Sequence, residues 1–161
     1  SEAAAKALAV KSLRDLSVAA FEERATELPD LLRRRARHVI GENERVRQAV
    51  EALRVGDLAQ LGELINLSQQ SLRVDYEVSS DALNTIVKCA RSHPAALGAR
   101  LTGGGFAGCA IAALDVSDGP ELIEDFTQTV SDCYTALTDL SPVFYTVKAS
   151  AGAGLISLPE S

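Results

Sequence analysis

The sequence predicts an α+β fold in which helices pack on a mostly antiparallel sheet. Up to Pro94, apolar residues recur at intervals of three and four, which is the period of an amphipathic helix. Beyond it the period changes, and short apolar runs of strand length flank a glycine-rich loop. Helices that come first and strands that come later are typical of the α+β class.

The first part of the chain is expected to be helical throughout. Short helices occupy the first 30 residues, where Leu28-Pro29 interrupts an apolar stripe. The dominant helix is predicted over about Arg34–Arg54, and Gly56 fits the residue that stops it. Asp57 fits the N-cap of a second helix, with Gln60 placed for a capping box.

A third helix and the sheet follow. Ser79 or Ser80 is expected to cap this helix, and Pro94 closes it. A strand, a glycine loop and a second strand are predicted within Gly98–Val116, and Pro120 starts another helix.

Further strands are predicted near the end of the sequence. Val143–Val147 is expected to form one, led in by Pro142, and Gly154–Leu158 is a candidate for another. With 161 residues and 47% hydrophobic content, the chain suits one domain with a proper core.

Composition narrows the function classes. A net charge of −6 argues against general affinity for nucleic acid, and nothing reads as a signal peptide or a membrane span. The cysteines, Cys89, Cys109 and Cys133, show neither zinc spacing nor a paired disulfide pattern, which favours a reducing cytoplasm. Because the sequence has no methionine, we expect it to be part of a longer protein.

The glycine run after Thr102 is the strongest local signal. Gly103, Gly104 and Gly105 are costly in backbone entropy, so a positive φ or a close approach by another group is expected. Successive N–H groups in such a turn can form a concave nest for phosphate. The spacing also fits G-x-G-x-x-G, but a strand follows instead of the long helix that a dinucleotide site needs. A tight hairpin without a ligand is the alternative of equal weight.

Leu101-Thr-Gly-Gly-Gly-Phe-Ala-Gly-Cys109 resembles the third conserved motif of the GHMP small-molecule kinases, in the form that galactokinases carry. Leu101 stands for methionine and Ala107 for glycine. If position 107 needs a positive φ, its alanine puts strain in the loop.

A second stretch, Arg34–Val46, resembles the galactokinase pattern Arg-Ala-Arg-His-Val-x-x-Glu-Asn-x-Arg-Val. We expect it to serve helix packing and polar contacts, with His38 as a satisfied packing residue. The basic cluster at its start is interpreted as a solvated helical face that Glu42 and Glu44 balance. No Ser/His/Asp or Cys/His set for nucleophilic catalysis can be assembled.

A third stretch, Ser71–Ser79, is similar to the galactokinase sequence Ser-Leu-Arg-Asp-Asp-Tyr-Glu-Val-Ser. It departs at Val74, and just before it Gln69 stands where the family often has histidine. The polar residues between the two helices could stitch the turn or border a substrate. The residues considered as substrate-bordering are Arg73, Asp75 and Tyr76.

The resemblance implies a GHMP kinase C-terminal domain over residues 1–161, with a ferredoxin-like α+β fold. The whole enzyme would use ATP and Mg²⁺ to phosphorylate the anomeric hydroxyl of galactose, in the galactose metabolism of the cytoplasm. The phosphate loop and catalytic aspartate would lie in an N-terminal half, the partner of this one, so no catalytic residue or metal ligand is assigned here and the 161 residues alone are expected to be inactive.

By the same resemblance, five residues would face the nucleotide phosphates: Thr102, Gly103, Gly104, Gly105 and Phe106. A kinase for N-acetylgalactosamine or another sugar, and a sensor that binds sugar and ATP without turnover, are the alternatives.

Overall fold

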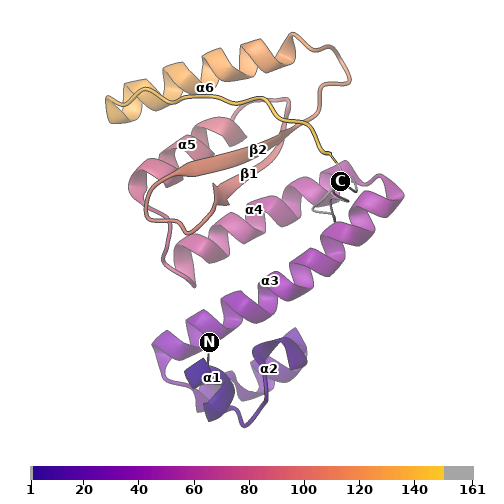
Figure 1. Ribbon diagram of the computed structural model, residues 1–161, viewed down its shortest axis with the longest axis vertical. Helices are drawn as coiled ribbons and strands as arrows, with labels where there is room; N and C mark the ends of the chain where they lie inside the picture. The colour runs from indigo at the N-terminus through magenta and orange to yellow at the C-terminus, as the bar shows by residue number, and fades with distance from the viewer. Residues whose placement is uncertain (1, 151–161) are drawn as a thin grey trace, which may run out of the picture.

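The computed structural model describes residues 2–150 and shows helices around a small sheet (Figure 1). The two strands pair antiparallel, so the α+β class is confirmed. The helices are α1 (Glu2–Ala7), α2 (Val18–Arg24), α3 (Asp30–Val55), α4 (Leu58–Val74), α5 (Asp81–Arg91) and α6 (Leu122–Thr138), with short 3-10 turns η1 (Leu13–Asp15) and η2 (Ala25–Glu27) and strands β1 (Ala96–Thr102) and β2 (Cys109–Leu114).

Helix α3 packs on one core with its first half and on α4, which lies between α3 and the sheet (Figure 1). Its first half packs on α1, α2 and the 3-10 turns, where Leu8, Phe21 and Ile40 are almost completely buried. It begins at Asp30, directly after Pro29 and earlier than predicted, and the carboxylate of Asp30 binds arginines of the first turns. It ends as predicted at Gly56, whose φ of 74° is the left-handed conformation of a helix stop.

The next two helices begin at their predicted caps. The Asp57 side chain accepts a hydrogen bond from the Gln60 backbone N–H at 2.9 Å, and that of Ser80 accepts one from Leu83 N–H at 3.3 Å. Helix α4 then lies along β1, where Gly62 and Gly98 bring the two backbones so close that a Cβ on either would collide. These small residues let the helix cover the edge of the strand.

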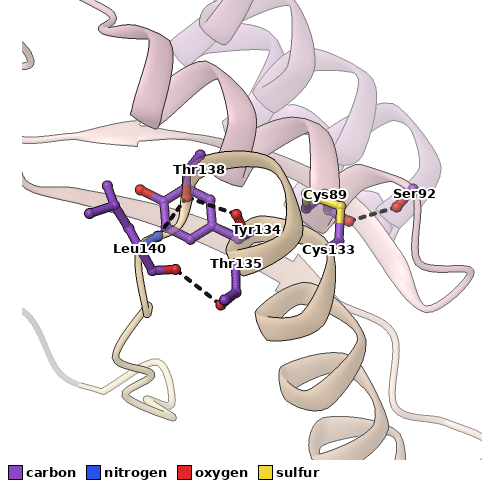
Figure 2. The surroundings of a disulfide bond; sticks show 7 residues. All are labelled: Cys89, Ser92, Cys133, Tyr134, Thr135, Thr138 and Leu140. Carbon is purple, nitrogen blue, oxygen red and sulfur yellow. Dashed lines mark hydrogen bonds between the residues drawn. A yellow bond between two sulfur atoms is a disulfide. The ribbon is translucent and has the colours of Figure 1, made fainter.

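The second core lies between the sheet, α5 and α6, where Val87, Ala99 and Val130 are buried. The prediction that the cysteines are unpaired is wrong. Cys89 on α5 and Cys133 on α6 form a disulfide, with their Cα atoms 5.8 Å apart (Figure 2). The residues are 44 positions apart in sequence, and only the packing of α5 against α6 brings them together.

The predicted strand at Val143–Val147 does not form. The segment has no strand pairing, and Val143, Tyr145 and Val147 are exposed while Phe144 packs against the second core. A strand requires a hydrogen-bonded neighbour, which this segment lacks. The apolar residues that predicted a strand therefore reflect only the contact of Phe144 with the core. The candidate strand Gly154–Leu158 lies outside the described residues.

Candidate functional site

The glycine loop connects β1 to β2 and turns through several left-handed residues. Gly103 and Gly105 each have a φ of 79°, and Gly108 has a φ of 113°. Phe106, with a φ of 63°, is the one residue of the loop that carries a side chain in this region. Ala107 has an ordinary φ, so the condition for strain at position 107 is not met and the strain lies at Phe106.

The tip of this loop is open. Thr102, Gly103 and Gly104 are exposed, and Phe106 is 71% exposed. Nothing lies within 4 Å of where a Cβ would stand on Gly103 or Gly104. Within residues 2–150, the backbone N–H groups of these two glycines donate no hydrogen bond. The tip therefore presents free donors to whatever lies outside the domain.

The base of the loop is held by the turn between α4 and α5. The Phe106 N–H donates to the Val78 carbonyl oxygen at 2.6 Å. Gly105 lies so close to the same carbonyl that a Cβ would collide with it. Val78 is itself tied to the end of α4 through a bond from its N–H to Leu72 O at 3.0 Å. Gly105 is thus required by a close approach as well as by its φ.

Helix α3 fixes that turn from the other side. Glu77, which has a φ of 57°, binds Arg34 and Arg35 at 2.5 and 2.6 Å. The hydrogen bond from Arg34, and then that from Arg35, lower the pKa of the Glu77 carboxyl. Arg35 also donates to the Asp75 carbonyl oxygen. The basic cluster, interpreted from sequence as a solvated helical face, is in part a clamp on the turn.

His38, Ser71 and Asp75 meet beneath the turn without forming a nucleophilic triad. Ser71 Oγ donates to the Asp75 carboxylate at 2.9 Å and lies 3.0 Å from His38 Nδ1, which therefore carries the proton toward Ser71. In a triad the histidine would instead stand between the other two. Burial lowers the pKa of His38, and its neutral ring stacks on Tyr76 at 4.3 Å.

A second polar cluster lies where α3, α4 and β1 meet. Glu42 accepts hydrogen bonds from Ser68 at 2.7 Å and from Arg45, and Arg100 of β1 donates to Ser68 at 2.8 Å. Burial would raise the pKa of Glu42, but the bonds from Ser68 and Arg45 outweigh it, and the pKa is lowered. The cluster joins β1 to the long helix just before the glycine loop.

The structure separates the residues considered as substrate-bordering. Asp75 and Tyr76 contact α3 or its histidine, whereas the exposed Arg73 lines an open groove of about 1070 Å³ between α4 and α5.

Within the described residues no cluster of histidine, cysteine and carboxylate side chains could hold a metal ion. In the same part of the chain, no helix is long and apolar enough to cross a membrane.

Sequence reasoning missed the hydrogen bonds that Gln69 makes. Its side chain is buried between the glycine loop and the turn, and it bonds to Leu101 and Ser79. One signal was available, because position 69 follows Ile65 by four and precedes Leu72 by three, on the inner face of the helix. A polar residue on such a face needs a partner.

Comparison with known proteins agrees with the motifs. Residues 49–132, more than half of the chain, match the family model of the GHMP kinase C-terminal domain. The chain is 41% identical to the galactokinase of Mannheimia succiniciproducens and 42% identical to that of Pasteurella multocida, each over 158 residues. These alignments cover 96% of this chain but 40% of each relative, so the chain spans about two fifths of their length.

Among solved structures, the crystal structure of Lactococcus lactis galactokinase complexed with galactose has a TM-score of 0.79 and 36% sequence identity to this chain. The match covers 84% of this chain and 34% of that one. Together with the family model, and with the other two motifs lying around the glycine loop, this shows that the chain belongs to the GHMP kinase family, with residues 49–132 matching its C-terminal domain.

Proposed function

We propose that residues 1–161 are the C-terminal domain of a galactokinase, which transfers the γ-phosphoryl group of ATP to the anomeric hydroxyl of galactose. The observation that carries the proposal is the glycine loop. Its base is bound to the turn through Val78, and its tip offers the N–H groups of Gly103 and Gly104, which donate no hydrogen bond to any residue the structure describes. The galactokinase relatives that align with 96% of the chain support the choice of substrate.

The free donors suit the chemistry of phosphoryl transfer. Negative charge spreads over the phosphoryl oxygens in the transition state, and catalysis is mostly positioning and electrostatic stabilisation. Exposed backbone N–H groups that have no partner within residues 2–150 need little reorganisation to bind such oxygens. We assign phosphate binding to Thr102, Gly103, Gly104, Gly105 and Phe106. ATP, when bound, would supply the phosphoryl group.

Among residues 2–150, no group of three or more histidine, cysteine and carboxylate side chains could hold a metal ion. We propose that the ligands of Mg²⁺ and the catalytic base lie in the N-terminal half of the same kinase. Helix α3 exposes Val46, Val50 and Leu53 on one face, which supports contact with further protein.

The substrate-bordering role of three residues is part of the proposal. The side chains of Asp75 and Tyr76 are engaged by Ser71 and His38, so these two would act mainly by fixing the shape of the turn. Arg73 is free to reach a ligand from the groove. A cytoplasmic location is also proposed, on the resemblance alone, since the disulfide removes the argument from unpaired cysteines.

A sugar panel with the full-length enzyme tests the function. ADP release and ³¹P spectra are followed with galactose, N-acetylgalactosamine and glucose, each at saturating ATP. We expect galactose 1-phosphate as the main product. Preferential turnover of N-acetylgalactosamine would replace the proposed substrate, and sugar binding without ADP release would identify a sensor.

A further inference from the structure

We infer that the Gln69 side chain is the positioning residue that holds the glycine loop against the turn between α4 and α5. Its amide is buried, with Gln69 5% exposed, and both ends are engaged. The expected effect on catalysis rests on the proposed function, whereas the contacts of Gln69 do not depend on that function.

The oxygen end of the amide binds the strand that leads into the loop. Ala99 and Leu101 point their backbone N–H groups away from β2, toward α4. Asn66 Oδ1 accepts the first at 3.2 Å, and Gln69 Oε1 accepts the second at 2.8 Å. The Leu101 N–H is the last of these before the loop, so Gln69 determines where the loop leaves the helix-covered edge.

The nitrogen end of the amide binds the turn. Gln69 Nε2 donates to Ser79 Oγ at 3.0 Å, and Ser79 Oγ donates in turn to Asn84 Oδ1 at 2.8 Å. Ser79 directly follows Val78, whose carbonyl oxygen accepts the Phe106 N–H. Gln69 thus holds one end of the loop directly and the other through two residues of the turn.

These contacts close a ring around the loop. From Gln69 the ring passes through Leu101 and along the loop to Phe106, then through Val78 and Ser79 back to Gln69. An amide side chain closes the ring because the position needs both an acceptor and a donor. The acceptor binds the Leu101 N–H, and the donor binds the Ser79 hydroxyl, whose own hydrogen is donated to Asn84. A leucine supplies neither function, and an ionised glutamate supplies only the acceptor.

Opening the ring should displace the tip. Without Gln69, the buried Leu101 N–H loses its acceptor, and of the two hydrogen bonds that tie the loop to α4 and the turn, only the one to Val78 remains. The free N–H groups of Gly103 and Gly104 lie in between, and a displacement on the order of 1 Å can cost up to about a hundredfold in rate. We expect this loss in kcat, because donors aimed at the transition state affect ground-state binding less.

The experiment compares Gln69→Leu and Gln69→Glu with matched substitutions at another glutamine of α4, Gln60→Leu and Gln60→Glu, in the full-length enzyme. Gln60 is exposed, lies outside the groove that Arg73 lines, and makes no side-chain hydrogen bond within the described residues. For each variant, kcat and the KM for ATP are measured, together with amide hydrogen exchange of the peptides that cover Ala99–Gly108.

For Gln69→Leu, we expect loop amides to exchange about tenfold faster or more and kcat to fall by about tenfold or more, with KM for ATP within about threefold. Gln69→Glu, which keeps an acceptor for Leu101, should show a smaller change of the same kind. Both Gln60 variants should stay within about twofold of the parent.

Unchanged loop exchange in both Gln69 variants would overturn the inference. Faster exchange with an unchanged kcat would also overturn it, because Gln69 would then not position the loop for the reaction. If Gln69→Leu does not fold, Gln69→Glu decides. If the parent enzyme fails to phosphorylate galactose, the proposed function fails, whereas the exchange data still test whether Gln69 holds the loop.

Discussion

The glycine-loop region and the α5–α6 layer differ in the balance of polar and apolar contacts that hold them. Around the loop, α3, α4 and the turn meet through polar contacts such as those of Arg34, Glu77 and Gln69, beside a small apolar cluster of Leu72, Val78, Leu83 and Leu101. In the α5–α6 layer, the sheet packs on Phe126 and Val130, and the Cys89–Cys133 disulfide crosslinks the helices (Figure 2).

This difference distinguishes residues that orient backbone groups from residues that mainly stabilise the fold. Directional hydrogen bonds fix where backbone groups point, whereas apolar burial stabilises the fold without aiming any group. Substitutions at the loop are therefore expected to act mainly on activity, and substitutions in the layer mainly on stability.

The largest expected effect comes from removing the rest of the enzyme. We expect residues 1–161 alone to fold but to show neither ATP binding nor turnover. Two N–H bonds to a charged acceptor give about 3–6 kcal/mol in total. Association costs about 4–15 kcal/mol. The remainder falls short of the roughly 4 kcal/mol of a millimolar complex.

Calorimetric titration of ATP into residues 1–161 measures this directly. Mixing them with the separately expressed N-terminal half should restore some turnover if the loop completes a shared site. Tight ATP binding by residues 1–161 alone would refute the division of the site between two halves.

The disulfide is the next largest effect and acts on stability alone. It closes a segment of 44 residues, and such a crosslink contributes about 4 kcal/mol, mainly by restricting the unfolded chain. We expect Cys89→Ala with Cys133→Ala to lower the melting temperature strongly while kcat stays near that of the parent. Cys109→Ala, at the exposed free cysteine, is the control. Equal melting temperatures for the parent with and without reductant would contradict this.

Gly104 and Gly105 test the loop at neighbouring positions. Gly104→Val meets open space and should lower kcat by about a hundredfold with little change in melting temperature, by obstructing the approach of phosphate. Gly105→Ala meets the Val78 carbonyl at a φ of 79° and should cost about 1–3 kcal/mol of stability as well. Kinetics and thermal melts on both variants decide; parental turnover of Gly104→Val would place the loop outside the active site.

Ala107→Gly should have a small and unfavourable effect. Because Ala107 has an ordinary φ, the glycine relieves no strain and only increases the entropy of the unfolded chain, at a cost of about 0.5–1 kcal/mol. Thermal melts of the two proteins measure it. A raised melting temperature would show that the alanine is strained after all.

The smallest effect expected is the pH dependence from Glu77. Arg34 and Arg35 lower its pKa, so the contribution to stability is present above the unfolded value of 4.5 and is lost as pH falls through the lower folded value. Glu77→Gln should therefore reduce the difference in melting temperature between about pH 7 and about pH 3.5. The same difference in variant and parent would show that the pair does not stabilise the fold.

Local sequence was sufficient for several helix ends and for the hairpin. The end of α3 and the start of α4 depend on Gly56 and Asp57, which satisfy helix ends within a few residues, so the sequence predicted both. The start of α3 was predicted near Arg34, whereas the helix begins at Asp30. The glycine loop could likewise be predicted from the sequence, because a left-handed backbone restricts which residues occur there.

Contacts between distant segments were decided only by the tertiary structure. The Cys89–Cys133 pair and the missing strand at Val143–Val147 both depend on which element lies alongside, which no local pattern records. The same holds for Gln69, which joins Leu101 to Ser79 across 32 and 10 positions of sequence. Helix caps and turns are short-range interactions that the sequence determines by itself, whereas partners separated by tens of residues are selected by the packing of whole helices.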